Sequence, residues 1–393
     1  MWGGRAHRRM HGPPVLKPCW GAMSILFSPL RIGPMMLDNR VFVSPMCQYS
    51  ARGGLAGDWH WQHYGSLAVG GAGALTLEAT AVAPEGRITA GCLGLYDPRQ
   101  EAALAALVAH LKRLASIPIG IQLSHAGRKA ACRTPWDGGG ALSIGTGWPV
   151  LGPSALPFGA ERPLPVEMNE ADIERVTEAF AGSARRALRA GLDYLELHLA
   201  HGYLLASFLS PLANRRTDAY GGALANRLRF PLAVAAAVRA VWPAHKALGA
   251  RIDAHEWIEG GRPFSETLEV CAALRGAGVD FVCISSGAVA EGVRIPAAPG
   301  YLLGYAGRVR RKTGMPVRAV GMLHRPRMAE RAVADGDADC VALGRSFLFD
   351  PRWAMKAAHV LGAGDLFSRQ FQLAGPARWH PGRALAAALN EPA

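Results

Sequence analysis

The sequence predicts an α/β protein built as a single (β/α)8 TIM barrel, and three observations support this fold class. Eight short apolar runs alternate with longer stretches whose apolar residues recur at helical spacing. The chain has 393 residues, and eight such units over roughly 300 residues match the usual size of this barrel. The first strand candidate runs into SPMCQYS, without the G-x-G-x-x-G turn that usually marks a doubly wound open sheet.

We expect the eight barrel strands in chain order at 41–46, 74–82, 118–124, 194–200, 247–253, 281–287, 316–321 and 340–345. Helical patterns fill most intervals between them, and the stretch DIERVTEAFAGSARRALRAG is closed by Gly191 as a C-terminal cap. One connection, residues 126–168 after the third strand, is too long for an ordinary loop. It follows the C-terminal end of that strand, on the face where barrel active sites form, which favours a lid or pocket wall. A surface insertion without a role is the alternative.

The two ends of the chain differ in composition from the barrel. Residues 1–22 are basic, rich in Pro and Gly, and lack the apolar segment of a signal peptide. We expect them to be an extension, either disordered or the product of a mis-chosen start codon, and 23–393 to form the barrel domain. No run of eighteen apolar residues occurs, which argues against a membrane span.

Charge and cysteine content bound the partners and the compartment. The net charge of +13 is compatible with a nucleic-acid partner, but the arginines are spread along the chain and also suit a biased genome. We therefore expect no nucleic-acid partner. The seven cysteines are scattered, without a C-x-x-C pair, which favours a reducing cytoplasm over a disulfide framework or a structural zinc site.

Strand alternation places polar side chains inside the predicted barrel. On 194–200, Leu195, Leu197 and Leu199 share one face, so Glu196 and His198 point inward. The same test on the three other strands of this run of four puts one polar side chain of each inside: Glu78, Gln122 and Arg251. Breaking a buried ion pair costs about 3–5 kcal/mol. This polar ring must therefore be mutually paired, by a Glu–Arg pair and waters, or must face a polar ligand.

His198, His201 and Tyr203 lie at the C-terminal end of the fourth strand, where barrels carry their chemistry. The two histidines with Glu196 could form a metal site. No Asp or His on the neighbouring strand ends completes that set, so we expect no metal. Arg128 and Lys129, in the long connection, are interpreted as solvated charges.

The ends of strands seven and eight suggest a phosphate site. They read AVGM and ALGRS and supply Gly321, Gly344 and Arg345. Barrels often bind phosphate at this place through backbone N–H groups and a basic side chain. Together with the polar ring, these residues predict an elongated phosphorylated cofactor across the C-terminal face.

Six segments resemble the old yellow enzyme family, and within it the bacterial branch that includes the xenobiotic reductases. They are SPMCQYS (44–50), EATAVAPEGRIT (78–89), IQLSHAGRKA (121–130), HLAHGYLLASFLSPLANRRTDAYGG (198–222), NRLRF (226–230) and ALGR (342–345). The resemblance runs from about residue 23 to 379. It implies a barrel with non-covalent FMN that takes hydride from NADPH or NADH. The implied activity is that of an ene-reductase, which reduces the C=C bond of α,β-unsaturated carbonyl compounds by a ping-pong reaction.

The resemblance also implies roles for individual residues. The residues expected to contact FMN are Ser44, Pro45, Met46, Cys47, Ala79, Gln122, Arg251, Gly321, Gly344 and Arg345. Cys47 would tune the flavin, and Arg251 would stabilise negative charge on the reduced ring. Tyr49 would lie beside the substrate.

His198 and His201 would bind and polarise the substrate's carbonyl oxygen, and Tyr203 would protonate the α-carbon. Arg378 and Trp379 are candidates to reach the substrate pocket of a neighbouring subunit in a homodimer or homotetramer. The segment that carries them, AGPARWHPGR, matches the family only loosely.

Three other functions stay open at this point. A dihydrouridine-synthase-like flavin barrel acting on RNA would suit the charge, but the C-terminus is too short for an RNA-binding tail. A metal-dependent lyase or hydrolase on the same fold would be colourless. A flavin-binding regulatory protein without turnover would not need His198, His201 and Tyr203.

Overall fold

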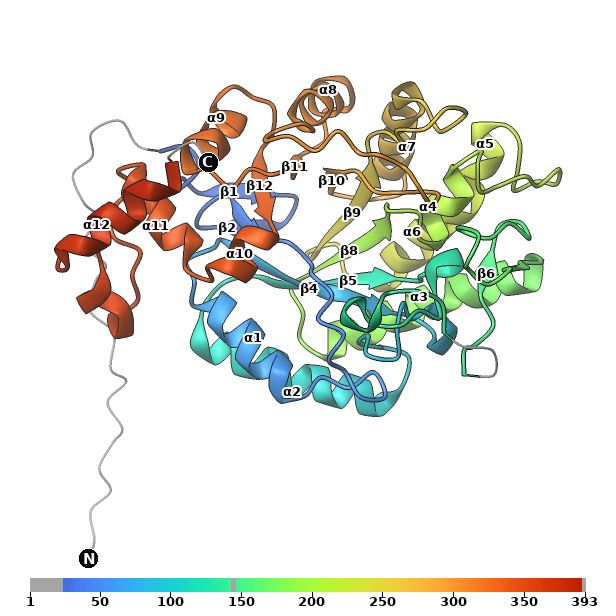
Figure 1. Cartoon of the computed structure of the whole chain (residues 1–393), viewed down its shortest axis with the longest axis horizontal. Coiled ribbons are helices and arrows are strands. Elements are labelled where there is room, and N and C mark those ends of the chain that lie inside the picture. Colours follow the sequence, from blue (N-terminus) through green and yellow to red (C-terminus); the bar gives the residue numbers. More distant parts are fainter. Residues whose placement is uncertain (1–23, 143–145, 391–393) are drawn as a thin grey trace, which may run out of the picture.

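The computed structural model describes residues 24–142 and 146–390, so the expected extension at 1–22 lies outside the described residues. Eight parallel strands close into a barrel, and helices surround it (Figure 1). The barrel strands follow the order of the chain: β3 (Val41–Val43), β4 (Ala74–Ala81), β5 (Ile119–Ser124), β8 (Tyr194–Leu199), β9 (Ala247–Asp253), β10 (Phe281–Ser285), β11 (Val317–Ala319) and β12 (Cys340–Leu343). The predicted (β/α)8 fold is confirmed, with each strand at its expected place.

The helices after successive strands form the outer layer (Figure 1). They are α1 (Asp58–Ala68), α2 (Pro98–Leu114), α3 (Glu170–Arg189), α6 (Arg229–Val241), α7 (Phe264–Gly276), α8 (Leu303–Thr313), α9 (Pro326–Ala334) and α11 (Trp353–Val360). Shorter helices are α4 (Leu204–Leu209), α5 (Leu224–Arg227) and α10 (Arg345–Phe349). A hairpin of β1 (Leu30–Ile32) and β2 (Met35–Leu37) precedes the barrel.

Local sequence signals set the ends of α3. The Asn169 side chain accepts a hydrogen bond from the Asp172 amide at 2.9 Å, which caps the first turn. At the other end, Gly191 adopts a positive φ of 85°, a conformation that a glycine reaches without strain. The cap predicted at Gly191 is therefore present, and it directs the chain into β8.

The lower barrel interior is filled by aromatic rings. Tyr194 packs edge-on against Phe42 and Phe281, with ring centroids 6.1 and 6.4 Å apart. Two strand residues are glycines where these rings approach: a Cβ on Gly120 would lie 2.3 Å from the Tyr194 ring, and one on Gly249 would lie 2.3 Å from Phe281. The glycines on the neighbouring strands thus leave the space that these large rings occupy.

A β-bulge in β4 overturns one expectation about the barrel interior. The register between β4 and β5 shifts between Leu77 and Ala79, so alternation breaks at Glu78. The Glu78 carboxylate accepts hydrogen bonds from the Tyr64 hydroxyl of α1 at 3.0 Å and from the backbone N–H of Gln48 at 2.9 Å. Glu78 therefore faces α1 and the loop after β3, and its predicted inward orientation was wrong.

The connection between β5 and α3 carries short elements: η2 (Gly127–Lys129), η3 (Pro135–Asp137), β6 (Leu151–Gly152) and β7 (Val166–Glu167). Arg128 is 3% exposed and donates to the carbonyls of Leu156 and Pro157 at 3.2 Å and of Val289 at 2.6 Å. The connection is thereby fastened to the loop after β10, and the interpretation of Arg128 as a solvated charge was wrong.

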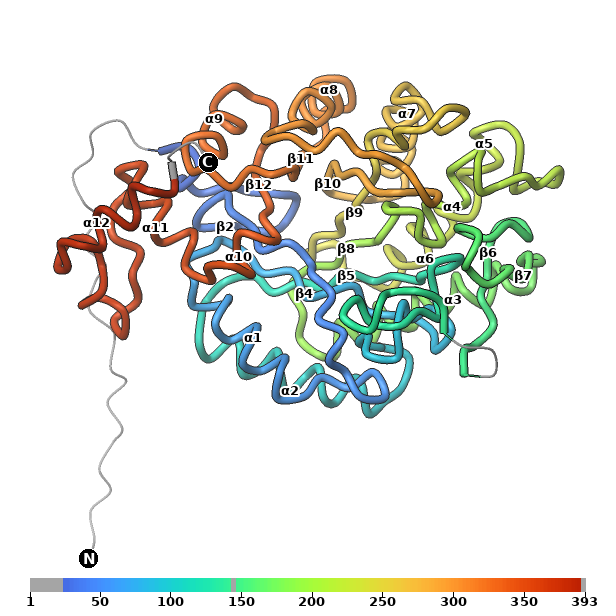
Figure 2. Tube along the Cα trace, in the orientation of Figure 1, coloured from blue at the N-terminus to red at the C-terminus, as the bar shows by residue number. Residues whose placement is uncertain are grey.

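The C-terminal segment packs on one side of the barrel, beside α9 and α11 (Figure 2). It holds η4 (Arg369–Ala374), α12 (His380–Ala387) and η5 (Ala388–Asn390). Among the helices of 24–142 and 146–390, none has the length and apolar character that crossing a bilayer requires.

Candidate active site

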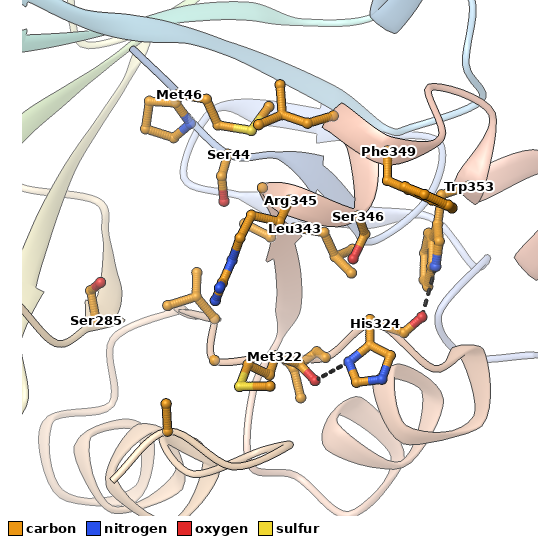
Figure 3. A pocket seen from close by; sticks show the side chains of 18 of the residues that line it. Ser44, Met46, Ser285, Met322, His324, Leu343, Arg345, Ser346, Phe349 and Trp353 are labelled. Carbon is orange, nitrogen blue, oxygen red and sulfur yellow. Dashed lines mark hydrogen bonds between the residues drawn. The ribbon is translucent and has the colours of Figure 1, made fainter. Parts of the chain in front are cut away.

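One cavity of about 910 Å³ opens at the C-terminal ends of the barrel strands. Eight of the residues predicted from the sequence line it: Ser44, Pro45, Met46, His201, Arg251, Gly321, Gly344 and Arg345. Figure 3 shows Arg345 extending across it, with Ser44 and Met46 on one side and His324 and Trp353 on the other. Four predicted ring-contacting residues and all three predicted phosphate-binding residues thus share one cavity, whereas Cys47, Ala79 and Gln122 are not among its lining residues.

The end of the cavity near β11 and β12 has the features of an anion site. Gly321 adopts a φ of 110°, and a Cβ there would lie 3.2 Å from the Tyr301 ring. Gly344 precedes Arg345 at the start of α10, and all three predicted residues border the cavity. A guanidinium beside glycine backbone that no side chain covers is well suited to bind a phosphate.

At the other end, a hydroxyl joins two of the predicted residues. Nη2 of Arg251 donates to Oγ of Ser285 at 3.0 Å, and the same oxygen lies 2.8 Å from Nε2 of His201. Within the described chain, Nε of Arg251 is buried and has no hydrogen-bond partner. This guanidinium therefore keeps a donor free for a ligand.

His198, His201 and Tyr203 form a compact cluster beside this end. The His198 ring centroid lies 5.0 Å from that of His201 and 4.7 Å from that of Tyr203, with both pairs edge to face. The Ala200 amide donates to Nδ1 of His198 at 3.3 Å, so the proton of the neutral ring is on Nε2. His198 therefore offers an N–H donor.

Burial keeps the cluster uncharged near neutral pH. It lowers the pKa of His198 and of His201 well below the usual value, and the charge of Arg251 adds to the effect on both. Burial also raises the pKa of Tyr203 well above its usual value. The site therefore combines neutral imidazoles with a protonated phenol, which suits hydrogen-bond donation to an oxygen and proton donation to carbon.

The His201 peptide is held in an uncommon conformation by two charged side chains. His201 has a φ of 62°, in the left-handed region. Oδ2 of Asp253 accepts its N–H at 2.6 Å, and Nζ of Lys129 donates to its carbonyl at 2.8 Å. Burial raises the pKa of Asp253 to about 7 and lowers that of Lys129 to about 8. The two groups thus hold the backbone of His201 and fix the position of its Cα, from which the imidazole extends.

Lys129 also lies beside the ring of the predicted proton donor. Its Nζ lies 5.1 Å from the Tyr203 ring centroid and 4.6 Å from that of Phe158, which belongs to the long connection. The interpretation of Lys129 as a solvated charge was therefore wrong. The described residues of 126–168 are not among those that line the cavity, so the role of this connection as a lid or pocket wall stays a prediction.

Cys47, Tyr49 and Ala79 lie together after β3 and in β4. The Ala79 amide and the Tyr49 hydroxyl both hydrogen bond to the Cys47 sulfur, while burial raises the Cys47 pKa well above its usual value. Cys47 is therefore a thiol at neutral pH. Tyr49 packs edge-on against Trp136 of the connection, with centroids 6.1 Å apart.

Gln122 lies below the cluster and connects to the barrel core. Its Nε2 donates to Oε1 of Glu196 at 2.7 Å, and Oε2 of Glu196 accepts a hydrogen bond from Arg318. Both oxygens of Glu196 are thus used within the protein, which removes Glu196 from the metal set considered for His198 and His201. No group of three potential metal ligands occurs among the residues that the structure describes.

Arg378 and Trp379 are not brought to this site. Arg378 is exposed, Trp379 is 45% exposed, and neither lines the cavity. Sequence reasoning also missed several residues, namely Ser285, Asp253, Arg318, His324 and Trp353. Asp253 ends β9, which pairs with β8, so the expectation that no Asp lies on a neighbouring strand end was wrong. The alternation of β11 contained a signal for Arg318, since Val317 and Ala319 flank it as the outward pair.

Comparisons with known proteins identify the kind of protein that this chain resembles. The model of the NADH:flavin oxidoreductase / NADH oxidase family matches residues 25–363. NADPH dehydrogenase from Geobacillus thermodenitrificans is 41% identical over 86% of this chain and 95% of its own length. NADPH dehydrogenase from Bacillus subtilis is 37% identical over 86% of this chain and 95% of its own length.

Solved structures agree with the barrel. Morphinone reductase superposes with a TM-score of 0.73 at 26% identity, over 88% of this chain and 92% of that protein. A 2-naphthoyl-CoA reductase in complex with 2-naphthoyl-CoA gives a TM-score of 0.77 at 26% identity. The match covers 86% of this chain and 52% of the reductase, so this chain spans about half of that protein's length.

Proposed function

The chain belongs to the NADH:flavin oxidoreductase / NADH oxidase family, and from this premise we propose that it is an ene-reductase. Membership implies FMN as the cofactor and NAD(P)H as the hydride donor. The proposed reaction reduces the activated C=C bond of an α,β-unsaturated carbonyl or related electrophilic compound in two half-reactions. The observation that carries this proposal is the uncharged cluster of His198, His201 and Tyr203 beside the cavity.

The residues present fit FMN. The cavity of about 910 Å³ is lined by Ser44, Pro45, Met46 and Arg251 of the predicted ring contacts and by all the predicted phosphate contacts. The unpartnered Nε of Arg251 offers a buried donor among the ring contacts, and Arg345 offers a cation among the phosphate contacts. Ser44, Pro45, Met46, Cys47, Ala79 and Gln122 would hold the ring, and Gly321, Gly344 and Arg345 the phosphate.

When bound, FMN would accept hydride from NAD(P)H and supply it to the β-carbon of the substrate. The chain's own residues act on the substrate's oxygen and α-carbon. His198 and His201, neutral through burial, would orient the carbonyl and stabilise negative charge on its oxygen. Tyr203, protonated at neutral pH, would give its proton to the α-carbon.

Other residues would shape the substrate site. Tyr49 packs on Trp136, and Phe158 packs on Lys129, so the connection after β5 contributes aromatic walls. We propose that these walls favour flat, apolar enones. Cys47, kept as a thiol by burial, would act on the flavin through a hydrogen bond or its dipole rather than as a charge.

We propose that Arg378 and Trp379 act in a neighbouring subunit of a homodimer or homotetramer. Both side chains are exposed and outside the cavity of their own barrel. Leu373 and Leu385, on the same segment, are 78% and 57% exposed, and apolar surface of this kind suits a subunit contact. Analytical ultracentrifugation of the wild type and of an R378A/W379A variant tests the assignment.

We also propose a cytoplasmic enzyme that acts on small molecules and not on nucleic acid. The six cysteines within the described ranges are free thiols, as a reducing compartment requires.

The visible spectrum tests the function directly. A yellow protein that bleaches with NADPH under anaerobic conditions, and regains its colour with 2-cyclohexen-1-one, has both half-reactions. A yellow protein that bleaches but is not reoxidised by any enone would overturn the ene-reductase proposal. A colourless protein that takes up no added FMN would contradict the flavin assignment as well.

A further inference from the structure

A fully buried ion pair lies in the barrel interior below the site. Arg318 of β11 donates to Oε2 of Glu196 of β8, and both side chains are 0% exposed. The Arg318 guanidinium carbon lies 4.9 Å from the Phe42 ring centroid and 5.4 Å from that of Phe281. The cation is therefore enclosed by aromatic rings and has one acidic partner.

Stability alone gives a poor reason for such a pair. Removing two charges from water costs several kcal/mol per ion, and apolar residues of similar volume often serve as well or better. Nε and Nη1 of Arg318 are buried and lack a partner in the described chain, so this pair is not even fully satisfied. The useful consequence of the pair lies in what the other oxygen of Glu196 does.

That oxygen determines how the Gln122 amide is turned. A carboxylate only accepts hydrogen bonds, so Gln122 must point its NH2 group at Oε1 of Glu196, 2.7 Å away. Gln122 is 2% exposed and cannot exchange this partner for bulk water. Its carbonyl oxygen is consequently directed away from Glu196 as an acceptor.

We propose that Glu196 and Arg318 are positioning residues that lock the Gln122 amide, so that its carbonyl oxygen accepts the imide N–H of the bound flavin. Arg318 occupies Oε2 of Glu196, Oε1 of Glu196 orients the Gln122 amide, and the amide oxygen is left to accept a hydrogen bond from the ring. The inference rests on the proposed function, because it requires FMN above Gln122. It assigns a role to a residue pair that takes no part in hydride or proton transfer.

The test is FMN binding to the apoprotein, followed by the quenching of flavin fluorescence. In E196Q the new amide can present either its oxygen or its NH2 group, so Gln122 is free to turn. The hydrogen bond between the neutral amide oxygen and the flavin is then lost, and we expect the Kd for FMN to rise about 2- to 12-fold. In a Q122L background, the same E196Q change should leave the Kd nearly unchanged, because its effect passes through Gln122.

The variant E196Q/R318M separates orientation from charge and leaves no unpaired buried ion. We expect it to bind FMN as weakly as E196Q does. The matched control is E266Q, which breaks the pair between Glu266 and Arg227, 2.8 Å apart and remote from the cavity. It should bind FMN like the wild type.

Three outcomes would overturn the inference alone, while the wild type binds FMN normally. E196Q could bind FMN as tightly as the wild type, its effect could be the same in the Q122L background, or E196Q/R318M could recover wild-type affinity. A wild-type apoprotein that binds no FMN would instead overturn the proposed function, and this inference with it.

Discussion

The hydroxyl oxygen of Ser285 lies 2.8 Å from Nε2 of His201. The same oxygen accepts a hydrogen bond from Arg251, so one side chain connects the arginine expected beside the flavin with a histidine expected at the substrate. A serine hydroxyl both donates and accepts, and it holds the imidazole whichever nitrogen carries the proton. Ser285 is 2% exposed, so water does not readily replace it.

Replacing Ser285 by alanine should loosen the His201 ring without removing it. A hydrogen bond of this kind contributes about 0.5–1.5 kcal/mol, so we expect kcat/KM for 2-cyclohexen-1-one to fall roughly 2- to 12-fold. Steady-state kinetics measures the change. S183A is the control, because Ser183 is buried in α3, outside the cavity lining, and its hydroxyl donates to the Leu95 carbonyl. Equal kinetics for S285A and the wild type would contradict a positioning role for Ser285.

Replacing Tyr203 by phenylalanine should separate carbon protonation from electron transfer. General acid catalysis contributes about 10²–10⁴-fold, and we expect reoxidation by 2-cyclohexen-1-one to slow by that factor in Y203F. Reoxidation by a quinone, which needs no proton on carbon, should be little changed. Stopped-flow absorbance measures the rate of flavin reoxidation by each acceptor. Equal slowing with the enone and the quinone would contradict the role of Tyr203 as the proton donor.

Lys129 should give the enone half-reaction an alkaline limit. Its pKa is lowered by burial to about 8, so the ammonium beside the Tyr203 ring is present below that pH and lost above it. Negative charge that develops on the phenol is stabilised only by the protonated form. We expect the rate of reoxidation to fall as pH rises through about 8, and K129Q to be slower at neutral pH and flat across this range.

The control for that profile is K112Q, because Lys112 lies on the exposed side of α2 and pairs with Asp193. It should keep the wild-type pH dependence. A K129Q variant that keeps the limit near pH 8 would assign the limit to another group.

Asp253 should make the apoprotein less stable as pH rises. Its pKa is raised from 3.8 to about 7 by burial, so the folded protein binds more protons than the unfolded chain between these values. Stability therefore decreases with rising pH across this window and is constant above it. D253N keeps an acceptor for the His201 amide but cannot ionise. We expect its Tm relative to the wild type to increase from pH 4 to pH 7, and a constant difference would refute this.

Arg345 should distinguish FMN from riboflavin. A charge-assisted contact with phosphate contributes about 1.5–3 kcal/mol, so we expect R345Q to bind FMN about 10- to 100-fold more weakly while its affinity for riboflavin is unchanged. R352Q, which lies outside the cavity lining and stacks on Phe371, is the control. Equal losses for both flavins would show that Arg345 does not hold the phosphate.

The barrel and much of its site could be predicted from the sequence because alternation in buried strands is a strong signal. Leu195 and Leu197 define the outward face of β8, and this places Glu196 and His198 correctly inside. The alternation failed at Glu78, where a bulge adds one residue to β4. A bulge depends on the pairing between strands, and one strand read alone does not contain it.

Long-range polar partners were harder to predict. Lys129 looks like a surface charge in the sequence, and only folding brings it to the carbonyl of His201, 72 positions away. Arg318 and Glu196 are separated by 122 positions. Whether such charges are solvated or paired depends on contacts across the barrel, which local patterns do not encode.

The bulge at Glu78 has a consequence for changes in chain length. Its carboxylate accepts a hydrogen bond from the backbone N–H of Gln48, which lies between Cys47 and Tyr49 in the chain. Deleting Ala79 from β4 would restore regular alternation by placing Glu78 opposite Gln122, with its carboxylate in the barrel. This would leave the backbone N–H of Gln48 and the Tyr64 hydroxyl without their acceptor. Such a deletion would therefore release the segment after β3, which carries Cys47 and Tyr49, without changing any residue of that segment.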